Sequence, residues 1–506
     1  MLNRHCLRIL TFVTALTCGT SLAEVPAQAL YITYCAVCHG SDRLGGTGPA
    51  LLPQNLSRLR ASMAKEVIAD GRPLTQMPGF DEQLDEEAIA ALTEFIYQPP
   101  TAAPDWSLEQ IQASHTVHHP EGTLGDRPIF EADLMNLFVV VEQGDHHATL
   151  LDGDSFEPIH RFKTRYALHG GPKYSRDGRY VYFASRDGWI SKFDIYNLKT
   201  VAEVRVGINT RNAAVSFNDK YVAVGNYLPH TLVLLHASDL SPLAVLPMID
   251  DEGNSSRVSA VYTAPPRGSF IVALKDMPRI LEIPYEPIST TQPVVREIQL
   301  DDYLDDFFFD QAYTVVMGAS RPEGQVDGNT VSGRVIDLDT GQKLADLAIP
   351  GMPHLGSGIS WNHGNSTVMA TPNLDEGAVS IIDMNSWRVI KTLQTKGPGF
   401  FMRSHDKSPY AWVDVFFGPH RDVVHVIDKQ SLELVKTLVP APGQTAAHVE
   451  FTRDGRYALL SIWEIDGALI VYDAHTLEEI KRIPMSKPSG KYNVYNKTHY
   501  EAGTSH

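Results

Sequence analysis

The residues with the clearest chemistry lie near the N-terminus, in the run Cys35-Ala36-Val37-Cys38-His39. Two thiols at this spacing can add to the two vinyl groups of one porphyrin, and the following histidine can then ligate the iron. A zinc knuckle would need two more ligands nearby, and a redox CxxC pair would need a βαβ context; the sequence suggests neither. The motif therefore predicts one heme c, attached covalently at Cys35 and Cys38 and ligated by His39.

The second axial ligand of this heme is expected to be a methionine, which raises the reduction potential into a range suited to electron transfer. Met77 lies in the irregular stretch Gln76-Met77-Pro78-Gly79, where small cytochromes present this ligand. Met63 lies in a helical stretch and is more consistent with a core position. We expect Met77 to be the ligand, with Met63 as the alternative.

Short helices are expected to position these ligands. Residues 27–34 favour a helix that leads into the motif, and 40–49 form a Gly-rich loop. Residues 81–98 favour a helix that ends at Pro99-Pro100. Its apolar side carries Leu84, Ile89, Leu92, Phe95 and Ile96. We therefore expect a small all-α cytochrome c domain over 24–100.

The first 23 residues have the features of a secretory signal peptide: Arg4 and Arg8, an apolar run over 9–17, and Ser21-Leu22-Ala23 as a cleavage site. No other stretch approaches the length of a membrane span. Of the 4 cysteines, only Cys35 and Cys38 would remain in the mature chain, so no disulfide framework is expected. These features predict export to the periplasm.

The composition narrows the possible partners. The formal net charge of -17 argues against nucleic acid and against an anionic membrane surface. It is compatible with a cationic redox partner. It is also compatible with a buried anionic ligand, provided that local arginines offset the field of the chain.

The rest of the chain repeats a pattern of an aspartate or similar residue, a few polar positions, a leucine, and then alternating apolar residues. Residues 101–125 form a polar, Pro-rich linker before the repeats. The copies start about 42 to 55 residues apart, the length of one four-stranded blade. They begin at Asp152, Asp194, His236, near Glu282, and at Asp337, Asp383, Asp428 and Asp473. We predict a mainly β fold with an eight-bladed β-propeller over 126–506, or a seven-bladed one if the copy near Glu282 is not a blade.

A heme c domain followed by such a propeller resembles the cytochrome cd1 family, whose propeller holds heme d1 on its axis. The matching segments include Thr164-Arg-Tyr-Ala-Leu-His169, Ser185-Arg-Asp-Gly-Trp-Ile, Gly225-Asn-Tyr227, Met352-Pro-His354 and Gly490-Lys-Tyr-Asn-Val-Tyr-Asn496. The resemblance implies that His169 ligates the d1 iron. Two further implications are a covalent heme c and a non-covalent heme d1 or dihydro-heme d1.

The sequence departs from the nitrite reductases of this family. They carry two histidines over the distal face of heme d1; one matches His354, but the other falls on Asp305. A new histidine, His448, appears in Thr445-Ala-Ala-His448-Val-Glu-Phe. This pattern is similar to the dihydro-heme d1 dehydrogenases, which oxidise a propionate side chain of heme d1 to an acrylate in the last step of its synthesis.

Under this resemblance, His354 ligates or covers the distal side of the d1 iron, and His448 is the expected base, because imidazole titrates near neutral pH. The carboxylates of heme d1 call for arginine partners, for which Arg186 and Arg211 are the candidates, with Tyr227 as a hydrogen-bond donor. Electrons would leave through heme c to a periplasmic acceptor.

Three functions remain open: a heme d1-forming dehydrogenase, a nitrite reductase with an altered distal pocket, and a carrier that hands heme d1 to a nitrite reductase. The missing second histidine counts against the reductase. The heme c motif counts against the carrier, which needs no electron outlet. The dehydrogenase is therefore the function that we expect, with the cd1 nitrite reductase as a possible recipient of its product.

Overall fold

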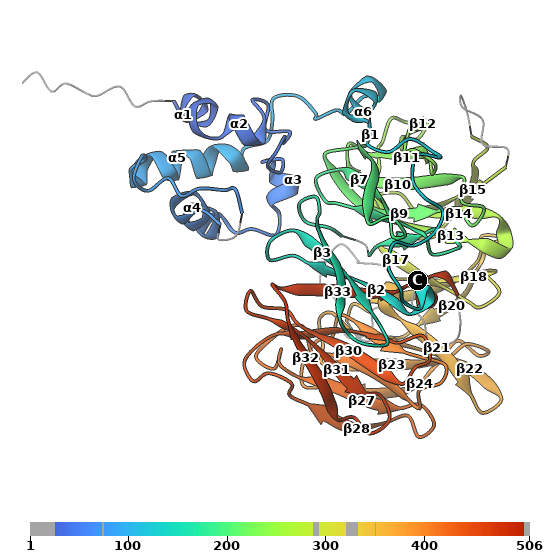
Figure 1. Cartoon of the computed structure of the whole chain (residues 1–506). Coiled ribbons are helices and arrows are strands. Elements are labelled where there is room, and N and C mark those ends of the chain that lie inside the picture. Colours follow the sequence, from blue (N-terminus) through green and yellow to red (C-terminus); the bar gives the residue numbers. More distant parts are fainter. Residues whose placement is uncertain are drawn as a thin grey trace, which may run out of the picture.

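The computed structural model describes residues 26–72, 75–169, 171–286, 293–319, 332–349 and 351–499. The expected signal peptide over 1–23 lies outside these residues. A small helical domain lies beside a ring of eight β-sheets (Figure 1). Within the described residues, no helix is long and apolar enough to cross a membrane.

The N-terminal domain consists of α1 (Ala27–Tyr34), α2 (Ala36–His39), α3 (Pro53–Leu56), α4 (Ala61–Asp70) and α5 (Glu86–Tyr97). The helix expected over 81–98 begins later, at Glu86, because the side chain of Asp85 caps it by accepting the N–H of Ala88 at 2.8 Å. Leu84 is buried ahead of this helix, and Ile89, Leu92 and Ile96 are buried on it. Together they pack the core of the domain beneath the CxxCH motif.

The C-terminal domain is an eight-bladed propeller, as the repeats predict. Its first blade contains β2 (Leu137–Glu142), β3 (His147–Asp152) and β4 (Pro158–Lys163), and the second β5 (Lys173–Tyr174), β6 (Tyr180–Ala184), β7 (Trp189–Asp194) and β8 (Lys199–Arg205). The third holds β9 (Asn209–Val215), β10 (Tyr221–Leu228), β11 (Thr231–His236) and β12 (Pro242–Pro247), and the fourth β13 (Val258–Ala264), β14 (Ser269–Leu274), β15 (Arg279–Pro284) and β16 (Arg296–Gln299). Glu282 lies in β15, so its copy of the repeat is a true blade and the seven-bladed alternative is wrong.

The other four blades follow the same plan. They are formed by β17 (Asp306–Phe309), β18 (Val315–Ala319), β19 (Gly333–Asp337) and β20 (Lys343–Leu347), then β21 (Ile359–His363), β22 (Ser366–Pro372), β23 (Ala378–Asp383) and β24 (Arg388–Gln394). The last two contain β25 (Met402–Ser404), β26 (Tyr410–Asp414), β27 (Val424–Asp428) and β28 (Glu433–Leu438), and β29 (Ala446–Phe451), β30 (Tyr457–Ile462), β31 (Ala468–Asp473) and β32 (Glu479–Pro484). The C-terminal strand β33 (Pro488–Asn493) pairs with β2 and thereby completes the first blade. Helix α7 (Val494–Thr498) follows it.

The repeated Asp-to-Leu pattern marks the turn between the third and fourth strands of a blade. At Asp383, for example, the carboxylate accepts the N–H groups of Asn385 at 3.1 Å and Ser386 at 2.7 Å. The fourth residue after the aspartate has a left-handed backbone, with φ of 54° at Trp387 and 57° at Leu432. The strand register shifts beside each of these turns. The repeat in the sequence is therefore a repeat of turn geometry.

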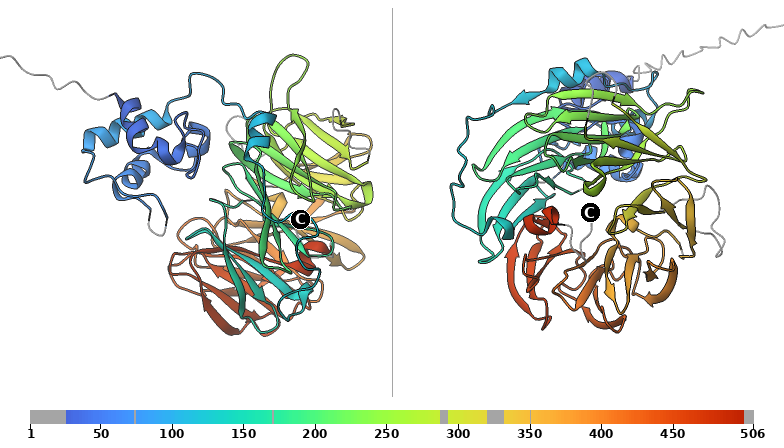
Figure 2. Two further views of the ribbon diagram at one scale, coloured as in Figure 1. Left: turned by 45° about the horizontal axis from the view of Figure 1, so that its top comes forward. Right: turned by 90° about the vertical axis from the view of Figure 1, so that its right-hand side faces the viewer.

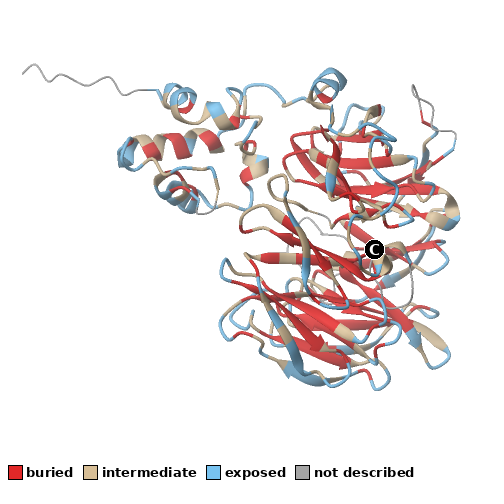
Figure 3. Cartoon of the chain, viewed as in Figure 1, coloured by how far each residue is buried: buried red, intermediate tan, exposed pale blue. Residues whose placement is uncertain are grey.

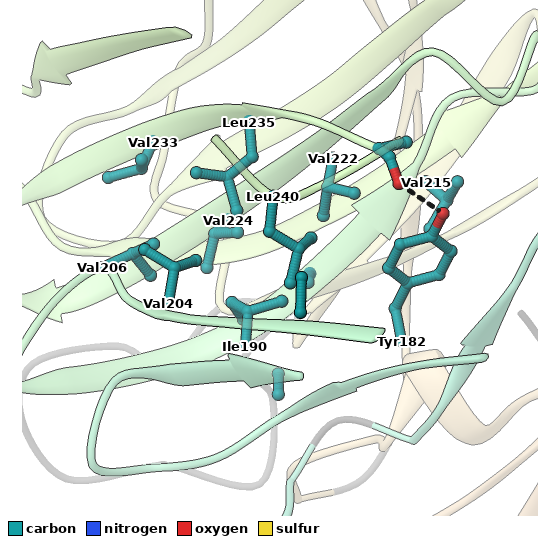
Figure 4. Packing of buried hydrophobic residues seen from close by; sticks show 14 of the residues in the cluster. Tyr182, Ile190, Val204, Val206, Val215, Val222, Val224, Val233, Leu235 and Leu240 are labelled. Atoms are coloured by element: carbon teal, nitrogen blue, oxygen red, sulfur yellow. Dashed lines mark hydrogen bonds between the residues drawn. The ribbon is translucent and has the colours of Figure 1, made fainter. Parts of the chain in front are cut away.

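Apolar side chains fill the spaces between neighbouring blades. Figure 3 shows that the strands of the propeller are mostly buried, whereas the exposed positions lie on loops and outer edges. Between the second and third blades, Ile190, Val204, Val222 and Leu235 pack together, and the Tyr182 hydroxyl donates to the Ala237 carbonyl at 2.9 Å (Figure 4). Such packing fixes the blades rigidly around the central space of the ring (Figure 2).

The segment between the two domains also has structure. Helix α6 (Leu108–Ser114) and strand β1 (Thr116–Val117) follow an exposed stretch, and β1 adds a fifth strand to the second blade by pairing with β8. The helical domain contacts the propeller between β8 and β9, where Asn55 Nδ2 donates to the Ile208 carbonyl at 3.0 Å. Arg205 donates to the Leu44 carbonyl, and its guanidinium lies 4.4 Å from the ring centre of Trp106.

Candidate functional site

A cavity of about 2450 Å³ lies between the helical domain and the propeller, and both domains line it. Ligand pockets are usually about 300–1,000 Å³, so this one has room for more than one large group. All ten residues predicted from the sequence line it: Cys35, Cys38, His39, Met77, His169, Arg186, Arg211, Tyr227, His354 and His448. The structure thus brings together residues that are separated by more than 400 positions in the chain.

The CxxCH residues fit a covalent heme c. Cys35 and Cys38 are unpaired, half-buried thiols that face the cavity. His39 Nδ1 donates to the Pro49 carbonyl at 2.7 Å, which orients the ring and leaves Nε2 able to ligate an iron. A Cβ atom on Gly48 would lie 2.7 Å from His39 Cε1, so the loop packs this closely only because the residue is glycine.

The two candidate methionines lie in different surroundings. Met77 lies on the loop between α4 and α5 and lines the cavity; its N–H donates to Thr75 Oγ1 at 3.1 Å. Met63 lies on α4 and its side chain is 49% exposed, so the core position expected for it is wrong. It is also absent from the described lining of the cavity. These positions favour Met77 as the axial ligand.

His169 lies on the loop between β4 and β5. Its Nδ1 donates to the Arg211 carbonyl at 2.7 Å, and its Nε2 accepts from Arg186 at 2.7 Å and from Arg211 at 3.2 Å. Burial, together with the charges of these two arginines, holds the pKa of His169 well below its usual value of 6.5. The neutral ring therefore has its Nε2 lone pair engaged by two guanidinium groups of the cavity wall.

The charge of the cavity wall is opposite to that of the whole chain. Its described lining contains nine Lys and Arg residues but only six Asp and Glu residues, in a chain of net charge -17. Burial, with the nearby charges of Arg58 and Arg211, lowers the pKa of Arg186 to about 9. A cavity of this kind favours a ligand that carries several carboxylates.

His354 also lines the cavity, just before a short 3₁₀ turn (Leu355–Ser357). Its Nδ1 lies 2.5 Å from the Phe400 carbonyl and 2.8 Å from Ser357 Oγ, and its ring packs on Phe400. Asp305, which matches the second histidine of the reductases, lines the same cavity and forms an ion pair with Lys275. The cavity wall thus contains His354 and, at the position matched to the second histidine, an ion pair.

His448 occupies a β-bulge. It has a left-handed φ of 54°, at a register shift in β29 between Ala447 and Val449. Its N–H donates to Asp414 Oδ2 at 3.1 Å, and its carbonyl accepts from Lys491. The ring lies between Phe401 and Tyr492, with centroid distances of 4.9 and 5.2 Å. Backbone contacts and two aromatic rings thus orient a side chain whose orientation the sequence left open.

The imidazole of His448 is poised to accept a proton. Its Nδ1 is buried and has no hydrogen-bond partner among the described residues. Burial, and then the charge of Lys491, keeps its pKa well below 6.5, so the ring is neutral near pH 7. His448 also lines the cavity, and a neutral imidazole in the wall of a ligand cavity can act as a general base.

Sequence reasoning gave no role to Asp414, Lys491 or Arg58. Lys491 lies in a segment that matches the cytochrome cd1 family. The match marked this position, but it did not indicate what the lysine does. Asp414 follows an ordinary strand pattern and Arg58 an ordinary short helix. Their importance arises only from the folding of distant segments onto one cavity.

Comparisons with known proteins identify the family of the chain. The family model for the cytochrome D1 heme domain matches residues 132–497, and that for cytochrome c oxidase, cbb3-type, subunit III matches residues 24–96. A dihydro-heme d1 dehydrogenase of Pseudomonas aeruginosa is 58% identical over 96% of each chain. A nitrite reductase of Stutzerimonas stutzeri is 25% identical over 94% of this chain and 93% of its own. A solved structure of dihydro-heme d1 dehydrogenase NirN in complex with DHE superposes with a TM-score of 0.90 at 57% identity, covering 94% of this chain and 100% of that one.

Proposed function

The chain belongs to the cytochrome D1 heme domain family, and we propose that it is a dihydro-heme d1 dehydrogenase. In this reaction a propionate side chain of dihydro-heme d1 becomes an acrylate. One carbon–carbon single bond becomes double, and the substrate loses two protons and two electrons. The observation that carries the proposal is the neutral imidazole of His448 in the wall of a cationic cavity.

The residues that line the cavity have different proposed roles in binding and reaction. His169 and His354 would hold the substrate's iron through Nε2, and the ring of each is oriented by a backbone carbonyl near its Nδ1. Arg186 and Arg211 pair with the substrate's carboxylates, which replace the imidazole nitrogen as the acceptor of their N–H groups. His448 takes a proton from the propionate side chain. Tyr227 lines the cavity beside these arginines and donates a hydrogen bond to the same carboxylates.

The electrons leave through the cytochrome c domain, where heme c, held by Cys35, Cys38, His39 and Met77, supplies a one-electron acceptor. Its site opens into the same cavity as the substrate site, so the two groups are neighbours. A second electron requires that an external acceptor reoxidise the heme first. We place this reaction in the periplasm, with a periplasmic electron acceptor and a cd1 nitrite reductase as the recipient of the product.

Two features favour the dehydrogenase over the alternatives. The nitrite reductases use a second distal histidine to deliver protons to nitrite, and here the matched position is Asp305 in an ion pair with Lys275. A carrier of heme d1 has no need of a heme c site that opens into the ligand cavity, nor of a base beside the ligand. The position of His448 therefore separates this chain from both.

The decisive experiment loads the purified protein, with its heme c in place, with dihydro-heme d1 and adds an electron acceptor. The spectrum of the tetrapyrrole is followed, and nitrite consumption is measured separately. Conversion to heme d1 without nitrite turnover is expected. Appreciable nitrite turnover would favour the reductase, and binding without either reaction would favour the carrier.

A further inference from the structure

Arg58 belongs to the cytochrome c domain but faces the substrate site of the propeller. It follows α3 by two residues and lines the cavity along with Arg186 and Arg211. Helix α3 is fixed to the propeller by the hydrogen bond from Asn55 to the Ile208 carbonyl. The buried side chains of Leu52 and Ile208 pack in one cluster beside it. These contacts between the domains therefore position Arg58 at the wall of the substrate site.

The electrostatics place Arg58 close to the ligands of the substrate. Its charge is, after burial, the largest cause of the lowered pKa of Arg186. Three guanidinium groups from two domains thus line the same cavity, two of them in contact with the imidazole of His169. Their mutual repulsion opposes docking of the cytochrome c domain on the propeller. A ligand with several carboxylates removes that repulsion.

We propose that Arg58 is a substrate-binding residue that pairs with a carboxylate of the tetrapyrrole, so that the bound substrate fastens the cytochrome c domain onto the propeller. This inference rests on the proposed substrate. Because coupling between two equilibria is reciprocal, docking of the domain also strengthens substrate binding. The electron acceptor is therefore held in place most firmly when there is a substrate to oxidise.

The test compares the Arg58→Gln variant with Arg60→Gln, a matched control in which an exposed arginine outside the described cavity lining is changed. Dihydro-heme d1 is titrated anaerobically into the full chain with heme c already reduced, so that binding is measured without oxidation. Loss of a charge-assisted hydrogen bond should raise the Kd of Arg58→Gln about tenfold. Arg60→Gln should bind like the wild type. An unchanged heme c spectrum and unfolding temperature show that each variant is folded.

Hydrogen–deuterium exchange supplies a second readout. In the wild-type chain the substrate should protect residues 53–60 as well as the segments around Arg186 and Arg211. In Arg58→Gln the first protection should disappear while the other two remain. A Kd within twofold of the wild type, or protection of 53–60 that survives the substitution, would overturn the proposal.

The outcomes separate this inference from the proposed function. If the chain binds dihydro-heme d1 without converting it, and Arg58→Gln weakens that binding, the role of Arg58 stands and the dehydrogenase does not. Conversion with an unaltered Kd in Arg58→Gln overturns the role of Arg58 alone. A wild-type chain that does not bind dihydro-heme d1 overturns both.

Discussion

At the scale of single residues, hydrogen bonds distinguish the three proposed iron ligands among the cavity histidines from the proposed base. His39, His169 and His354 each have Nδ1 within hydrogen-bond distance of a backbone carbonyl, at 2.7, 2.7 and 2.5 Å. That arrangement fixes the tautomer with the lone pair on Nε2, as in iron-ligating histidines; in His169 this lone pair accepts from Arg186 and Arg211. His448 has no such partner for Nδ1 among the described residues. The first three therefore suit metal ligation, and the fourth suits proton transfer.

Replacing His448 with alanine should separate binding from conversion. General bases contribute about 10²- to 10⁴-fold to a rate, and we expect a loss in this range in kcat, with the Kd for dihydro-heme d1 within about threefold of the wild type. Single-turnover spectroscopy measures the first quantity and anaerobic titration the second. The control is His475→Ala, at an exposed histidine on the outer side of the propeller. Full activity of His448→Ala would remove its role as the base.

The pH dependence should report on Asp414. Burial raises the pKa of this carboxyl to about 6, and as a carboxylate it accepts the N–H groups of Phe400, Phe401 and His448. As the pH falls through about 6, the carboxyl gains a proton and loses acceptor capacity, which loosens the bulge that holds His448. Because the pKa of His448 itself lies lower, kcat should fall on the acid side with an apparent pKa near 6.

The Asp414→Asn variant tests this assignment. It has no ionisable group at this position, so its kcat should be lower than that of the wild type and should not change near pH 6. Asp375→Asn, which alters an exposed carboxylate at the edge of the cavity, should keep the wild-type profile. An unchanged acid limb in Asp414→Asn would show that another group titrates.

At the scale of secondary-structure elements, the two candidates for the sixth ligand of heme c lie on different elements, one on a loop and one on a helix. The loop between α4 and α5 presents Met77 to the cavity, and α4 directs Met63 toward solvent. A methionine ligand raises the potential of a heme iron. Met77→Ala should therefore lower the reduction potential of heme c by on the order of 100 mV in a spectroelectrochemical titration. Met63→Ala should not change it; the opposite result would assign the ligand to α4.

The sequence predicted elements best where the signal is local. The turn aspartates recur because each holds its own hairpin, so eight blades could be counted from residues such as Asp383 and Asp428. The CxxCH motif carries its chemistry within five residues. The bulge at His448 could not be predicted, because β26 and β33 create it through Asp414 and Lys491. Solvent exposure of Met63 was missed because helical periodicity does not show which face a small domain buries.

At the scale of the whole molecule, Arg205 joins three parts of the chain. Its Nε donates to the Asp187 carbonyl at 2.9 Å, it also donates to the Leu44 carbonyl, and its guanidinium packs on Trp106. It thereby links the second blade, the loop after the heme c motif and the segment between the domains. This buried contact sets the position of heme c relative to the substrate.

Replacing Arg205 with glutamine should slow electron transfer from the substrate to heme c. Small displacements of reacting groups cost large factors in rate, and we expect about a tenfold loss or more in the rate of heme c reduction after stopped-flow mixing with dihydro-heme d1. The heme c potential should be unchanged. Arg482→Gln, on an outer strand of the eighth blade, is the control. A wild-type rate in Arg205→Gln would show that other contacts position the domain.

The strand that closes the ring, β33, also carries residues that position the proposed base, His448. β33 pairs with β2, and it carries Lys491 and Tyr492, which hold the backbone and the ring of His448. A propeller whose ring is not closed by β33 can therefore offer arginines and an anchoring histidine, but not a positioned base. Closure of the ring and reactivity toward the tetrapyrrole thus depend on the same strand.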